Sequence, residues 1–140
     1  MATDLQLGQH ATFSKTVTET DVVLFAGITG DLNPAHIDAV QAAKSRFGGR
    51  VAHGMLSAGL ISACIGMKLP GPGTIYLSQS LRFTRPVRIG DTVTARVEVA
   101  EWNATKRRAR LTTTCHNQDG ELVIDGEALV MVPDEGSETA

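Results

Sequence analysis

The spacing of hydrophobic residues changes near residue 74 of this chain. After that point, four segments rich in β-branched residues alternate apolar and polar positions, which predicts β-strands. The segments are Ile75 to Phe83, Thr92 to Trp102, Arg107 to His116 and Leu122 to Val132. Asp119-Gly120 is a typical hairpin signal between the last two strands, and Gly90-Asp91 marks a turn before the strand at residue 92. The C-terminal half is therefore predicted to form an antiparallel sheet.

The N-terminal half mixes one strand with short helical segments. Residues 11–18 alternate and predict a first strand, after which Thr18 and Asp21 have the spacing of a helix capping box. A short helix is expected over residues 22–28 and is ended by Gly30. Residues 31–36 are then predicted to form a loop stiffened by Pro34, and residues 38–46 to make one or two further helical turns.

The segment from Gly54 to Lys68 has the length and composition of a helix whose apolar residues lie on all sides, which predicts burial on all sides. One long buried helix, four following strands and the first strand indicate an α+β domain. We expect about five antiparallel strands wrapped around this central helix. Residues 1–140 are predicted to form a single domain, with a small, polar tail over residues 133–140 that is disordered.

Composition narrows the classes of function. The 140 residues carry a net charge of −2, so no overall attraction to nucleic acid or to an anionic membrane is expected. No segment has the pattern of a secretory signal or the length of a membrane span. Cys64 and Cys115 lie far apart in apolar surroundings and are expected to be buried free thiols of a cytoplasmic protein. No Cys/His spacing predicts a metal site and no glycine-rich motif predicts a nucleotide cofactor.

Polar residues that can perform chemistry gather at two nearby places. Asp31, Asn33 and His36 lie within six residues, and His53-Gly54 stands at the start of the predicted central helix. A carboxylate and a neutral imidazole that face one water can divide proton removal and proton delivery between them. A backbone N–H at a helix N-terminus can stabilise negative charge, and glycine allows a close approach.

The pattern Asp31-x-Asn33-Pro34-x-His36, with His53-Gly54-Met55 downstream, resembles the hydratase 2 motif of MaoC-like enzymes. Within that family it is most similar to the (R)-specific enoyl-CoA hydratases of polyhydroxyalkanoate-producing bacteria. The segment from Phe83 to Asp91 is also similar to one common in hot-dog-fold thioester proteins. The resemblance covers residues 10 to 132 and implies a hot-dog fold, a homodimer, and reversible hydration of trans-2-enoyl-CoA to (R)-3-hydroxyacyl-CoA, with no cofactor beyond the coenzyme A of the substrate.

The resemblance implies roles for individual residues, each with a plainer alternative. Asp31 and His36 would be catalytic, but Asp31 could be a turn residue and His36 an ordinary polar residue. Gly54 would offer the oxyanion N–H or simply begin the helix, and Asn33 would shape the loop. Ser62 would support Asp31 or bond back to its own helix.

Further residues are candidates for substrate contact. Ile65 and Val130 would line the acyl pocket or pack in the core. Guanidinium groups suit phosphate, so arginines near the motif are candidates for the coenzyme A phosphates, or else solvated charges. These are Arg46, Arg50, Arg82, Arg85 and Arg88, of which Arg85 and Arg88 are preferred. His53 is interpreted as mainly structural, with a supporting role left open.

Three other functions compete with the hydratase. A 3-hydroxyacyl-carrier-protein dehydratase would use the same chemistry on a different carrier, and assays with crotonyl-CoA discriminate the two. A non-catalytic acyl-thioester-binding domain belongs to another class, and the presence of both Asp31 and His36 argues against it. A thioesterase would release free thiol.

Overall fold

The structure is a computed structural model of the chain, and residues 4–134 are described. It contains five strands and four helices within those residues. In chain order they are β1 (His10–Thr16), α1 (Glu19–Thr29), α2 (Pro34–Ile37), α3 (Ala39–Ala43), α4 (Gly54–Met67), β2 (Ile75–Phe83), β3 (Thr92–Asn103), β4 (Arg108–His116) and β5 (Leu122–Met131).

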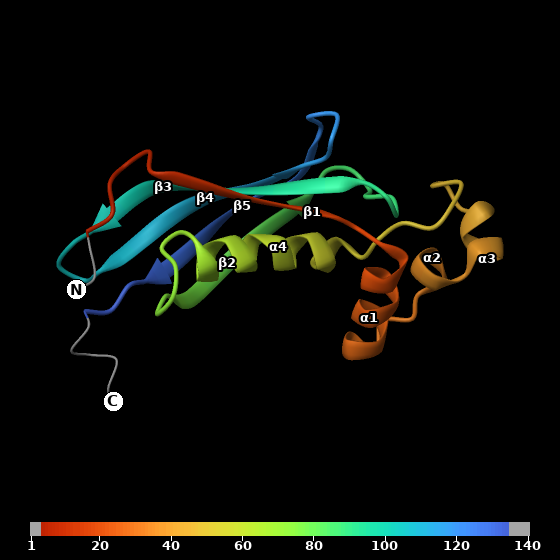
Figure 1. Cartoon of the computed structure of the whole chain (residues 1–140), viewed down its shortest axis with the longest axis horizontal. Coiled ribbons are helices and arrows are strands. Elements are labelled where there is room, and N and C mark those ends of the chain that lie inside the picture. Colours follow the sequence, from red (N-terminus) through yellow and green to blue (C-terminus); the bar gives the residue numbers. More distant parts are fainter. Residues whose placement is uncertain (1–3, 135–140) are drawn as a thin grey trace.

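The five strands form one antiparallel sheet in the order β1-β3-β4-β5-β2. α4 lies along one face of this sheet and packs against β1, β3 and β4 (Figure 1). The core between them is formed by the buried face of α4, including Ile61 and Ile65, and by inward residues of the strands, including Val97 and Leu111. A sheet wrapped around one central helix is the predicted hot-dog arrangement, and the α+β prediction is confirmed.

The local signals at the strand and helix ends are confirmed. Thr18 caps α1, and the reciprocal bonds of a capping box with Asp21 are both present. Gly30 ends α1 with a φ of 81°, a left-handed conformation that favours glycine. Cys64 and Cys115 are buried free thiols.

Three predictions from the sequence need correction. Residues 31–36 are not all loop, because Asn33 caps the short helix α2 that begins at Pro34. The next helix covers only residues 39–43, since Asp38 caps its start and the chain turns after Lys44. α4 is not buried on all sides of the single chain: Met55 and Met67 are 55% and 73% exposed.

The helices α1, α2 and α3 are grouped beyond one end of the sheet, and the N-terminus of α4 points toward them (Figure 1). This arrangement brings the segment around Asp31 and His36 to the first turn of α4. Of the predicted tail, residues 135–140 lie outside the described part, while Asp134 pairs with Arg107 at 3.1 Å. No helix in residues 4–134 is long and apolar enough to cross a membrane.

Candidate active site

Asp31 follows the glycine that ends α1 and has an exposed side chain. One carboxylate oxygen, Oδ1, accepts a hydrogen bond from the backbone N–H of Asn33 at 3.2 Å. This is the turn geometry that the sequence left open for Asp31. The second oxygen, Oδ2, accepts no hydrogen bond from the described residues and is available to a water or a substrate.

His36 lies in α2, which Asn33 begins by accepting a hydrogen bond from the N–H of Ala35. The Nδ1 atom of His36 is 2.8 Å from the carbonyl oxygen of Val51. A carbonyl only accepts, so Nδ1 carries the proton and Nε2 keeps its lone pair in the neutral ring. The backbone of Val51 thus selects the tautomer whose free nitrogen can take a proton.

His53 is only 2% exposed and caps the N-terminus of α4 by position, without a side-chain capping bond. Its Nε2 donates to the backbone carbonyl of Asp31 at 2.9 Å. Its ring stacks on that of His36, with centroids 3.9 Å apart and planes at 29°. The structure therefore joins His53 to both predicted catalytic residues.

The carboxylate of Asp31 and the imidazoles of His36 and His53 each place one ligand-type atom within 4.8 Å of the other two. The sequence separates them by 22 residues, so the fold brings them together. Three such atoms at this separation could also be tested for binding of a metal ion.

A cavity of about 570 Å³, a size typical of small-molecule sites, is lined in part by His36, whereas Asp31 and His53 are not among its lining residues. Its walls combine polar groups near α2 with apolar side chains from α4 and the sheet. They include His36, Gly54, Met55, Ser57, Phe83 and Ile124. An apolar chain with a polar head fits such a lining.

Gly54 lies in the first turn of α4, where backbone N–H groups have no intrahelical acceptor. The Phe83 ring packs directly on it. A Cβ at this position would lie 2.7 Å from Phe83 Cε1, which is too close. A side chain here would displace the Phe83 ring, so this packing favours glycine.

The structure does not bring every predicted residue to this cavity. Ile65 and Val130 are 1% and 0% exposed and belong to the core rather than to its lining. Ser62 is exposed and lies in a separate hollow between α4 and β2. Within residues 4–134, Ser62 makes no hydrogen bond to Asp31 or to its own helix.

The candidate arginines differ in their contacts. Arg46 and Arg85 line the cavity, and Arg85 pairs with Glu121 at 3.1 Å. Arg88 donates to the backbone carbonyls of Phe47 and Gly49, which fastens the loop between α3 and α4.

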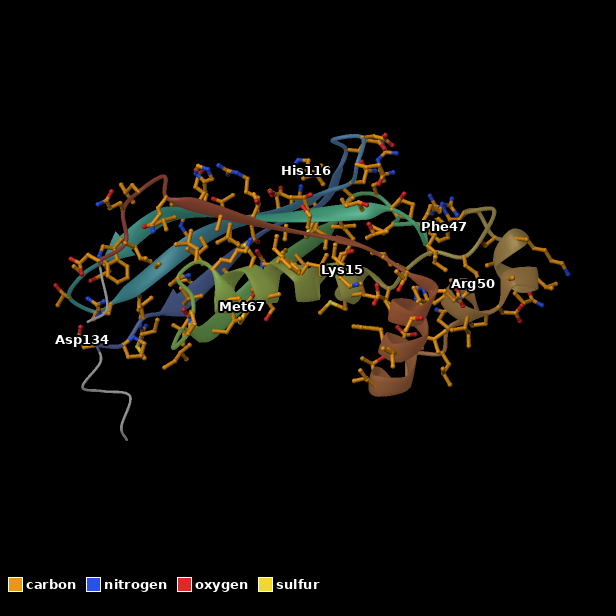
Figure 2. All side chains as sticks on the ribbon, in the orientation of Figure 1. Lys15, Phe47, Arg50, Met67, His116 and Asp134 are labelled. Atoms are coloured by element: carbon orange, nitrogen blue, oxygen red, sulfur yellow. The ribbon has the colours of Figure 1, made fainter. Side chains whose placement is uncertain are left out.

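Arg50 is engaged with other groups. It donates to the carbonyl of His36 at 2.6 Å and to both carboxylate oxygens of Glu19. Figure 2 shows Arg50 where α1 and α2 meet.

Several residues that line the cavity were not selected from the sequence, and Ser57 and Ile124 are two of them. Ser57 is fully buried, lines the cavity and has a hydroxyl without a hydrogen-bond partner among the described residues. Ser57 lies three residues after Gly54 and therefore on the same side of the helix, and this spacing could have indicated that it faces the site. Ile124 lines the cavity from β5 in the same alternating phase as the core residues Ala128 and Val130, so no signal singled it out.

Comparison with known proteins agrees with this geometry. The family model for the MaoC like domain matches residues 4–120, and the chain belongs to that family. The chain is similar to the (R)-specific enoyl-CoA hydratase of Rhodospirillum rubrum, with 53% identity covering 95% of this chain and 92% of the relative. It is also similar to the 3-hydroxybutyryl-CoA dehydratase of Methylorubrum extorquens, with 55% identity covering 93% of this chain and 82% of that protein. Among solved structures, the R-hydratase PhaJ1 of Pseudomonas aeruginosa has 52% identity and a TM-score of 0.89, covering 94% of this chain and 84% of that one.

Proposed function

We propose that the chain is an (R)-specific enoyl-CoA hydratase, which adds water reversibly to trans-2-enoyl-CoA to give (R)-3-hydroxyacyl-CoA. The observation that carries the proposal is the proximity of the Asp31 carboxylate to His36, whose tautomer leaves Nε2 bare and whose side chain lines a largely apolar cavity. The names of the relatives above point to the same chemistry.

Hydration forms a C–O bond at C3 and a C–H bond at C2, and it breaks one O–H bond of water and the π bond between C2 and C3. The free oxygen of Asp31 and the Nε2 lone pair of His36 are the two acceptors that would hold this water. One removes its proton, and the pair delivers a proton to C2. Both residues are proposed as catalytic.

Negative charge grows on the thioester oxygen during this step. The N–H of Gly54 is proposed to donate to that oxygen, helped by the positive end of the α4 dipole. The acyl chain would then follow the apolar wall formed by Met55, Phe83 and Ile124. Arg46 and Arg85, which line the same cavity, are the proposed contacts of the coenzyme A phosphates.

The active form is proposed to be a homodimer. β2 is an edge strand with unpaired backbone groups, and its Ile75, Tyr76 and Leu77 are 42%, 39% and 43% exposed. Met55 on α4 adds apolar surface that borders the hollow between α4 and β2. Pairing of two chains along β2 would cover this edge. Sedimentation at micromolar concentration should give the mass of a dimer, and a monomer alone would rule this arrangement out.

The buried free thiols fit the cytoplasmic location that we propose. The product would be an (R)-3-hydroxyacyl-CoA, the class of thioester from which polyhydroxyalkanoate is made.

The function is tested by mixing purified protein with crotonyl-CoA and following the loss of enoyl absorbance. We expect hydration without release of free thiol, and a slower reaction with the same acyl group on acyl-carrier protein. Preference for the carrier protein would identify a dehydratase of fatty-acid synthesis. Release of free thiol would identify a thioesterase, and binding without turnover would identify a non-catalytic domain.

A further inference from the structure

The two residues proposed as catalytic are held by one short segment, residues 50–53, just before α4. The Arg50 side chain donates to the carbonyl of His36, and the Val51 N–H donates to the carbonyl of Ala35 at 3.0 Å. The Val51 carbonyl in turn accepts from His36 Nδ1. These contacts fix α2, but only the fourth residue of the segment, His53, reaches Asp31.

The contact of His53 with Asp31 is specific to one tautomer. The acceptor is a backbone carbonyl, so Nε2 of His53 must carry the proton and Nδ1 must be bare in the neutral ring. The structure agrees, because Nδ1 is buried and has no hydrogen-bond partner among the described residues. The two stacked histidines therefore hold opposite tautomers, with the proton on Nδ1 in His36 and on Nε2 in His53.

The ring of His53 is also fixed on its sides. It stacks on His36 and packs against Phe25 of α1, with centroids 4.7 Å apart. A ring held in this way cannot turn without disturbing His36. The His53 ring also fixes the position of the Asp31 main chain through its hydrogen bond. The side chain of Asp31 is exposed and makes one local hydrogen bond, so it adds little restraint.

We propose that His53 is a positioning residue of the hydratase site: its Nε2–H holds the Asp31 main chain while its ring supports His36, so that both act on the same water. This inference rests on the proposed function. Misplacement of a reacting group by about 1 Å can cost roughly a hundredfold in rate, so this role predicts an effect on kcat rather than on substrate binding.

Two variants separate the hydrogen bond from the ring. His53→Phe keeps a ring between Phe25 and His36 but removes the donor, whereas His53→Gln keeps a donor at the end of the side chain. We expect His53→Phe to lower kcat for crotonyl-CoA by at least roughly tenfold, with KM changed by less than about twofold. His53→Gln should recover about threefold or more of the lost kcat.

His116→Gln serves as the control, because His116 follows the inward-facing Cys115 on β4 and points to the other face of the sheet. It should leave kcat unchanged. Full activity of His53→Phe would overturn the proposal. If both His53 variants lose the same fraction of kcat, and this loss parallels a fall in melting temperature, His53 has a structural role only and the proposal is overturned.

A measurement on the unaltered protein covers the case in which the variants do not fold. Nitrogen-15 NMR of the histidine rings should show the proton on Nε2 of His53 and on Nδ1 of His36. A proton on Nδ1 of His53 would contradict the hydrogen bond to Asp31 and overturn the proposal. An unaltered protein that does not hydrate crotonyl-CoA would instead refute the proposed function, whatever the tautomers.

Discussion

Two isoleucines provide a matched test of where the acyl chain lies. Ile65 and Ile124 are 1% and 0% exposed, but only Ile124 lines the cavity that holds His36 and Gly54. Shortening either residue to alanine removes the same atoms from a packed interior and typically costs about 2–5 kcal/mol. Unfolding entropy near 2.1 cal/mol/K per residue gives about 0.3 kcal/mol/K for 140 residues. Each variant should therefore lower the melting temperature by roughly 7–17 °C.

The two variants should differ in substrate preference. One methylene in an apolar pocket is worth about 1–3 kcal/mol, or roughly 10–200-fold in kcat/KM. Ile124→Ala should raise the ratio of octenoyl-CoA to crotonyl-CoA turnover by at least about tenfold, because it lengthens the cavity. Ile65→Ala should leave this ratio within about twofold.

The assay is kcat/KM for both substrates, with melting at one fixed protein concentration because dimerisation makes the melting temperature concentration-dependent. The milder Ile→Val changes, which cost about 0.5–1.5 kcal/mol, repeat the comparison if the alanine variants are too unstable. A changed ratio in the Ile65 variants but not in the Ile124 variants would refute the assignment of the acyl chain to this cavity. It would support the role that the family resemblance implies for Ile65.

Two substitutions and one labelling experiment test separate parts of the structure. Gly54→Ala should lower kcat by at least roughly tenfold, because the new Cβ displaces Phe83 and crowds the helix N-terminus; normal turnover would remove the Gly54 N–H from the mechanism. Burial raises the pKa of Cys115 to about 12 and also raises the pKa of Cys64, so both thiols stay protonated at neutral pH. A thiol reagent should label neither in the native protein and both after unfolding, and rapid native labelling would contradict their burial. Thr18→Ala removes a cap and should cost about 1 kcal/mol without a change in kcat, as measured by thermal melting and the crotonyl-CoA assay.

Features with a local cause were predictable from the sequence. The capping box at Thr18, the end of α1 at Gly30 and the alternating strands follow from neighbouring residues, and the structure has them within one or two positions. Asn33 shapes the chain as expected, although it does so by starting α2. The approach of Asp31 to His36 followed from their short separation.

Features that depend on distant contacts were not predictable in this way. The stacking of His53 on His36 joins residues 17 positions apart, and no periodicity reports it. The contacts of Arg88 were equally unpredictable, because its guanidinium donates to backbone carbonyls of the loop after α3, about 40 residues earlier in the chain. The exposed side of α4 was not predictable either. An apolar sequence predicts that a helix is buried, but it does not distinguish burial by the same chain from burial by a second copy.

The central claim is that Asp31 and His36 act together on one water. The most direct test is kcat for crotonyl-CoA hydration in Asp31→Asn, His36→Ala and the double variant, with circular dichroism and melting temperature as controls. A positioned acid or base contributes about 10²–10⁴-fold, and groups that act as a unit are not additive. Each single variant should therefore lose at least roughly a hundredfold, and the double variant should be little worse than the poorer single one. Near-normal turnover in either single variant, or losses that multiply in the double variant, would contradict the shared water.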